Sequence, residues 1–202
     1  MNWDWFKTFS KENPKFWENY ISSFETPLND ETKYIVFDCE TTGLNLETDR
    51  ILSIGAVAIE NNQVIVNNFI EIFLQQDIFK SDSVEFHGIL KEGNEEKFVE
   101  AEAIIRFLKF VENAILVGHN INFDIEMINE SLNRLNLGTI KNQYMDIGLM
   151  HQKFIDEISD ETISLDELCK LYKIKKNGRH TASGDAFIIA LLFLKLKKKL
   201  KI

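Results

Sequence analysis

Apolar and polar positions along the chain follow the period of strands in some stretches and the period of helices in others. The first clear strand pattern is the apolar run at 34–37, which predicts a buried strand. Further strands are predicted on either side of a turn at 61–62 and at two later apolar runs: 50–59, 63–74, 114–117 and 143–147. Three antiparallel strands followed by alternating helices and strands favour an α/β fold, with three α/β/α layers and a five-stranded mixed sheet.

Helical spacing of apolar residues predicts the helices of this fold. We expect them at about 97–111, at about 123–135, through His151, from the capping-box residues 164–167, and from about Ala182 onward.

Residues 1–30 precede the first strand and are rich in aromatic side chains. Asn13 and Pro14 favour a helix start, with Asn at the N-cap and Pro at the first helical position. We therefore expect an N-terminal aromatic helical extension at 1–30 and one domain at 31–202. The extension either packs against the domain or contacts a partner protein or the substrate.

The 202-residue chain is 45% hydrophobic and contains 2 Pro and 9 Gly, which suits a well-packed domain without long linkers. Cys39 and Cys169 are too few for a disulfide framework or a zinc site, so we expect a reducing, cytoplasmic location. The chain has no signal-peptide pattern and no apolar run near the roughly 18 residues of a membrane span, which predicts no membrane contact.

The formal net charge of −9 argues against a general nucleic-acid coat protein. From Lys170 onward, however, the chain carries ten Lys or Arg and a single acid, Asp185. A basic patch on an acidic body can follow a phosphate backbone. The alternative is a solvated, lysine-rich helix end, which we expect for most of 195–201.

Asp38 and Glu40 extend the first predicted strand by two carboxylates. Residues i and i+2 of a strand share a face, so these side chains point to one side, about 7 Å apart. Paired carboxylates repel each other and resist desolvation, and a cation between them removes this cost. The alternative is a strand end with two unrelated surface acids.

Asp124 and Asp185 are expected near the starts of two helices, where side chains can converge at one end of a sheet. Four carboxylates in one cleft cannot all stay ionised without cations. Oxygen ligands suit Mg²⁺ or Mn²⁺, and two such ions about 4 Å apart are a recurring device for phosphodiester hydrolysis. We therefore expect two Mg²⁺ or Mn²⁺ ions at this site.

His180 lies five positions before Asp185, short of the final helix. A histidine beside such a cleft can take the proton from an attacking water. The alternative is a loop histidine that bonds a carbonyl group.

Three motifs carry these residues in order: D-x-E-T-T-G-L at 38–44, G/H-N-x-x-F-D ending at Asp124, and H-x-A-x-x-D at 180–185. They resemble the DEDDh 3′–5′ exonucleases, the family of the proofreading epsilon subunit of bacterial replicative polymerase and of ribonuclease T. Residues 86–89 also resemble the family's His-Gly-Ile loop. His180, where a sister subfamily carries Tyr, favours the histidine class.

The resemblance implies a ribonuclease-H-like fold and a role for each matching residue. It assigns metal ligation to four acids and the role of general base to one histidine: Asp38, Glu40, Asp124, Asp185 and His180. It assigns substrate contacts to Thr41 at the 3′ end, Leu44 as a wedge against the last bases, and Phe123 along the groove. His87 and Asn120 either contact substrate or hold a loop in place, and His119 and His151 are expected to be structural.

The resemblance also implies an exonuclease that releases nucleoside 5′-monophosphates from the 3′ end of a nucleic acid, with DNA favoured over RNA. The alternatives are a catalytically silent module that binds nucleic-acid ends or a partner protein, and an exonuclease that trims RNA or very short oligonucleotides. The chain ends soon after the last predicted helix, which favours a free-standing enzyme, or one held by its extension. Gly184 departs from the expected pattern and is expected to loosen the turn before Asp185.

Overall fold

A six-stranded mixed sheet forms the centre of the protein, in the strand order β4-β3-β2-β1-β5-β6. The computed structural model describes residues 13–25, 33–78, 84, 88–89, 93, 95–156 and 162–202. The strands are β1 (Tyr34–Thr41), β2 (Ile51–Glu60), β3 (Gln63–Leu74), β4 (Lys97–Phe98), β5 (Ile115–Gly118) and β6 (Tyr144–Asp146). The first three strands pair antiparallel, whereas β4, β5 and β6 each pair parallel to a neighbour. The α/β class predicted from the sequence is confirmed.

The sheet has one strand more than the sequence analysis predicted. Lys97 and Phe98 form β4 beside the end of β3, where a helix was expected to have begun already. The helix α3 (Glu100–Val111) starts only after Val99, which is extended. Two residues are too few to show an alternating pattern, so only the pairing with Phe73 and Leu74 reveals this strand.

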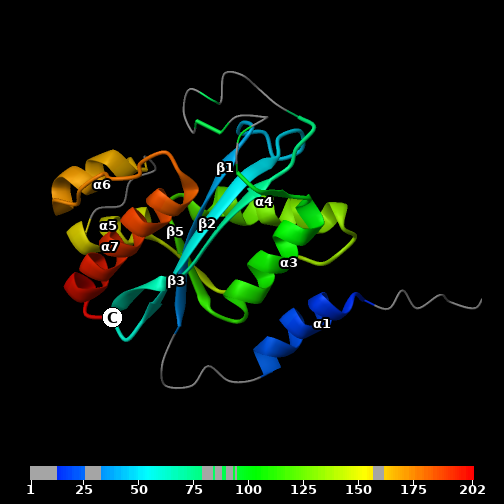
Figure 1. Cartoon of the computed structure of the whole chain (residues 1–202). Helices are drawn as coiled ribbons and strands as arrows, with labels where there is room; N and C mark the ends of the chain where they lie inside the picture. Colours follow the sequence, from blue (N-terminus) through cyan, green and yellow to red (C-terminus); the bar gives the residue numbers. More distant parts are fainter. Residues whose placement is uncertain are drawn as a thin grey trace, which may run out of the picture.

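Helices cover both faces of the sheet (Figure 1). One face carries α3 and α4 (Ile121–Arg134), and the other carries α5 (Ile147–Ile155), α6 (Leu165–Tyr172) and α7 (Ala182–Leu200). Phe37 packs in the core on the α3 and α4 face, and Val36 packs in the core on the α5, α6 and α7 face, as the alternation of a strand requires. Because both faces are covered, β1 reads as a continuous apolar run until its last residues.

The extension contributes α1 (Lys15–Ser22) and a short 3₁₀ turn, η1 (Ser23–Glu25), beside α3 (Figure 1). Trp17 and Tyr20 are buried, and the Tyr20 hydroxyl donates to Asn142 Oδ1 and accepts from the Lys141 backbone N–H, both at 2.7 Å. Burial raises the pKa of Tyr20 to about 12. Pro14 is the N-cap and not the first helical residue, one position from the prediction. Trp3, Trp5, Phe6 and Phe9 of the predicted extension lie outside the described residues.

The start of α7 lies directly on the sheet at Gly55 of β2. A Cβ atom at Gly55 would overlap the backbone of Ala182 and Ser183, so only glycine permits this approach. Gly55 is also the residue paired with Asp38 across the β1–β2 ladder. The first turn of α7 is therefore brought against the end of β1. Of the helices within the described ranges, α7 included, none is both long and apolar enough to cross a membrane.

Candidate active site

Asp38 and Glu40 lie two residues apart at the end of β1, on the face covered by α7. Asp185 projects from the first turn of α7, and one carboxylate oxygen from each of the three acids lies within 4.8 Å of the others. The alternation of the strand places Asp38 and Glu40 on one side, and the close approach at Gly55 brings Asp185 to them. The structure therefore places these three predicted ligands together.

Asp124 reaches the same region from the opposite face of the sheet. Its Oδ1 accepts a hydrogen bond from the backbone N–H of Cys39 at 2.9 Å. This amide is available because the pairing between β1 and β5 ends at Val36, three residues earlier. Asp124 is not among the three acids grouped above, but its charge contributes to the raised pKa of Asp38. The four predicted acids thus lie near the end of β1, in the part of that strand that extends beyond its pairing with β5.

Side-chain hydrogen bonds near the acids hold two helix starts in place. Asp146, at the end of β6, accepts from the N–H of Ile121 at 3.0 Å and from Gly148 at 2.7 Å, which ties α4 to α5. Thr181 caps α7 by accepting from the N–H of Gly184 at 3.1 Å. These contacts fix the first turns that carry Asp124 and Asp185.

Gly184 tightens the turn before Asp185. A Cβ atom at this position would overlap the carbonyl oxygen of Gly178, which itself has a positive φ of 76°. The expectation that Gly184 loosens the turn is therefore wrong, because the missing side chain lets the loop pack against α7.

Mutual repulsion and burial disfavour the ionised form of all four acids. Burial, together with the charges of Asp124 and Asp185, raises the pKa of Asp38 well above its ordinary value. Burial raises the pKa of Glu40 and that of Asp124 to about 7. Burial also raises the pKa of Asp185, although the neighbouring Arg179 counteracts part of the shift. A divalent cation would remove this cost.

We expect the metal-free protein to lose stability as the pH rises from about 4 to above 7. Over this range the folded protein binds more protons than the unfolded chain, because the pKa values of Glu40 and Asp124 are raised to about 7. Thermal melts in chelator should therefore give a higher melting temperature at about pH 5.5 than at about pH 8. The dependence should flatten in Glu40→Gln, and a melting temperature that rises with pH over this window would contradict the prediction.

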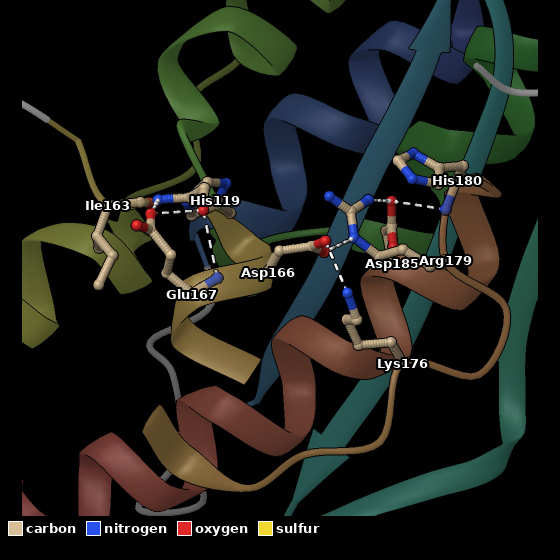
Figure 2. A network of polar contacts seen from close by, with 9 residues as sticks. His119, Ile163, Asp166, Glu167, Lys176, Arg179, His180 and Asp185 are labelled. Atoms are coloured by element: carbon tan, nitrogen blue, oxygen red, sulfur yellow. Dashed lines mark hydrogen bonds and ion pairs between the residues drawn. The ribbon is translucent and has the colours of Figure 1, made fainter. Parts of the chain in front are cut away.

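His180 is exposed and adopts a left-handed backbone conformation, with φ at 65°. Its backbone N–H donates to Asp185 Oδ2 at 3.3 Å, and Figure 2 shows the residue beside that carboxylate. Left-handed backbone is unfavourable for a residue with a side chain and is found at active sites when the surroundings impose it. The side chain thus lies near the acids and is open to solvent.

Thr41 ends β1 and Leu44 lies in the loop that follows, which is held by an unpredicted residue, Asp49. Asp49 is buried and accepts from the Thr42 hydroxyl at 2.7 Å and from the Asn45 N–H at 3.0 Å. The Thr41 hydroxyl donates to the Gly43 carbonyl at 2.7 Å. Leu44 is 82% exposed, the highest value among the exposed large apolar side chains of the described residues, and is free to contact a ligand.

The remaining predicted residues have varied surroundings. Phe123 is partly buried against the core on the α4 face, and Asn120 is an exposed N-cap with φ at 52°. The expected structural histidines have local partners, with His119 Nε2 at 2.8 Å from the Ile163 carbonyl and His151 Nδ1 at 2.8 Å from the Tyr172 hydroxyl. His87 lies outside the described residues.

Sequence reasoning missed Arg179, which lies between two acids (Figure 2). Its Nη1 donates to Asp185 Oδ2 at 2.5 Å, and its Nε donates to Asp166 Oδ1 at 2.8 Å. Asp166 also accepts from Lys176 at 2.8 Å. The only signal in the sequence is a basic residue immediately before the histidine of the third motif.

The four acids, Asp38, Glu40, Asp124 and Asp185, form a set of ligands that suits hard divalent cations. All four side chains offer carboxylate oxygens, the ligands that Mg²⁺ and Mn²⁺ prefer. Asp185 Oδ1 is buried and is the one such side-chain atom, among those of the described residues, that lacks a hydrogen-bond partner. A buried carboxylate oxygen without a donor is costly, and a metal ion satisfies it.

Comparisons with known proteins give one family. Residues 35–193 match the model of the family described as Exonuclease. The DNA polymerase III subunit epsilon of Buchnera aphidicola subsp. Acyrthosiphon pisum is 33% identical over 168 residues, which cover 79% of this chain and 70% of the relative. The PolC-type DNA polymerase III of Caldanaerobacter subterraneus is 32% identical over 182 residues, which cover 90% of this chain but only 13% of the relative.

Solved structures show the same fold. E. coli exonuclease I in complex with a dA16 oligonucleotide superposes with a TM-score of 0.72 at 17% identity, over 84% of this chain and 42% of that one. Exonuclease X in complex with 5′-overhanging duplex DNA superposes with a TM-score of 0.66 at 18% identity, over 84% of this chain and 93% of that one. The ribonuclease-H-like fold predicted from the sequence is therefore confirmed.

Proposed function

The chain belongs to the exonuclease family, and from this premise we propose that it hydrolyses phosphodiester bonds at the 3′ end of nucleic acid and releases nucleoside 5′-monophosphates. Membership confirms the resemblance to the DEDDh 3′–5′ exonucleases. The observation that carries the proposal is the approach of Asp38, Glu40 and Asp185 to within 4.8 Å, with Asp124 beside them.

In this proposal the four acids hold two Mg²⁺ or Mn²⁺ ions. When bound, the ions supply Lewis-acid activation of water and charge stabilisation of the leaving 3′ oxygen. Asp38, Glu40 and Asp185 are all placed to share an ion, because one oxygen of each lies within 4.8 Å of the others. His180 takes the proton of the attacking water, a role that its exposed side chain beside Asp185 permits.

Substrate contacts in the proposal come from the end of β1, from the loop after it and from α4. Thr41 meets the 3′ end, and the exposed Leu44 stacks against the last bases. Phe123 lines the groove beside Asp124, with Asn120 and His87 as supporting residues. DNA is the favoured substrate, because the relatives named above are DNA polymerase proteins and the superposed structures hold DNA. RNA trimming is the alternative activity of the same site.

The proposed boundary separates an extension at 1–30 from the exonuclease domain at 31–202. Trp17 and Tyr20 of α1 are already buried against the domain, so a protein partner would have to use other residues of the extension. Cys39 and Cys169 are free, which agrees with the proposed cytoplasmic location.

The proposal is tested by digesting 5′-labelled single-stranded DNA and RNA of equal sequence with Mg²⁺, Mn²⁺ or chelator. We expect a ladder that shortens from the 3′ end, faster on DNA and absent in chelator. A faster ladder on RNA would favour the trimming alternative. Binding without cleavage of either strand would overturn the proposal in favour of the silent module.

A further inference from the structure

Arg179 links the candidate metal centre to helix α6. Its side chain is 21% exposed and makes one contact to Asp185 of α7 and another to Asp166 in the first turn of α6 (Figure 2). The start of α6 is itself fixed by the capping box between Ser164 and Glu167. The start of α6 is therefore fixed, and Asp166 in its first turn binds the guanidinium of Arg179.

The two oxygens of Asp185 have different surroundings. Oδ2 accepts from Arg179 Nη1 at 2.5 Å and from the His180 N–H at 3.3 Å. Oδ1 is buried and has no donor in the described part of the chain. The terminal torsion of an aspartate is broad and roughly two-fold, so two donors on one oxygen are what select the orientation. This orientation leaves Oδ1 as the oxygen that a cation can reach.

We propose that Arg179 is a positioning residue, which holds Asp185 with Oδ1 presented to the metal ion and which is itself held by Asp166. The inference rests on the proposed function. It assigns Arg179 no contact with the reacting atoms. Hydrogen bonds to ligating carboxylates orient the ligand, and their loss typically costs about 10–100-fold in metal affinity or activity.

The geometry also explains why a lysine would not serve. The planar guanidinium donates to Asp166 through Nε and to Asp185 through Nη1, so one rigid group spans two helices. The ammonium group of a lysine carries the same charge but lacks the planar pair of donors that reaches both acids. Charge and orientation can therefore be separated by substitution.

The test compares Arg179→Gln and Arg179→Lys with Lys176→Gln. Lys176 contacts Asp166 and is 48% exposed, so Lys176→Gln removes one positive charge from the same network without touching Asp185. For each protein we would measure kcat and KM on 5′-labelled single-stranded DNA at saturating Mg²⁺, the Mn²⁺ affinity by calorimetry, and the melting temperature in chelator.

For Arg179→Gln we expect kcat to fall about 10–100-fold, KM to change less than about twofold, and Mn²⁺ binding to weaken about tenfold. Arg179→Lys should show the same defects despite its charge, and Lys176→Gln should behave as the wild type. Asp166→Asn should lower kcat in the same direction by a smaller factor, because an amide holds Arg179 less firmly than a carboxylate. This variant also tests the proposal if both Arg179 variants fail to fold.

Three results would overturn the inference. Tighter Mn²⁺ binding with unchanged or higher kcat in Arg179→Gln would show that the guanidinium only competes with the cation. A raised KM at unchanged kcat would make Arg179 a contact to the nucleic acid. Wild-type kcat and Mn²⁺ affinity in Arg179→Lys would show that only the positive charge of Arg179 matters. If the wild type cuts no 3′-ended substrate, the proposed function fails, while the Mn²⁺ affinities still decide whether Arg179 positions Asp185.

Discussion

Asp38→Asn is expected to lower kcat by about 10³-fold or more and to raise the melting temperature of the metal-free protein. A metal ion supplies several kcal/mol of transition-state stabilisation, and each 1.36 kcal/mol is about tenfold in rate, so losing a shared ligand has a large effect. In the absence of metal, the carboxylate of Asp38 is repelled by its neighbours and disfavoured by burial, which raise its pKa well above the ordinary value. A neutral amide of the same shape removes that cost.

Steady-state rates and thermal melts, each with chelator and with Mg²⁺, measure both effects. The gain in melting temperature that Mg²⁺ gives the wild type should be much smaller in Asp38→Asn, because an ion stabilises only the state that binds it. Glu47→Gln is the matched control, since Glu47 is an exposed acid of the following loop. Retention of more than about a tenth of the wild-type kcat, together with an unchanged response to Mg²⁺, would remove Asp38 from the metal centre.

His180→Ala is expected to lower kcat by about 10² to 10⁴ while leaving the Mg²⁺-dependent gain in melting temperature intact. A general base acts on the attacking water and holds no ion, so rate and metal binding should separate. The backbone N–H that donates to Asp185 remains in the variant, and the orientation of that carboxylate is preserved. The loss of rate then reports the imidazole itself.

Single-turnover digestion of labelled DNA at saturating Mg²⁺ isolates the chemical step of this variant. Asn177→Ala, an exposed position in the same loop, serves as the control for disturbance of the loop. An unchanged rate in His180→Ala would leave the histidine as a loop residue and return the role of base to another group or to water. A rate loss accompanied by loss of the Mg²⁺ response would instead indicate a collapsed site.

Local patterns were sufficient to predict the core of the fold and the positions of the four acids, at the end of β1 and at two helix starts. The period of two places Asp38 and Glu40 on one side of β1. A helix start after an apolar strand places Asp124 in the first turn of α4, and the start of the final helix places Asp185 in the first turn of α7. These features depend only on neighbouring residues. The two-residue strand β4 escaped prediction because it exists only through its partner β3.

The chain by itself determined which residues could carry the chemistry, because motif spacing and strand alternation are properties of short segments. Only the tertiary structure decided how they meet. The Cys39 amide is free for Asp124 because β5 stops pairing at Val36, and α7 reaches Asp38 because Gly55 has no side chain. Arg179 bridges Asp166 and Asp185 across two helices. Each depends on the register and packing of segments far apart in the chain, which no local pattern encodes.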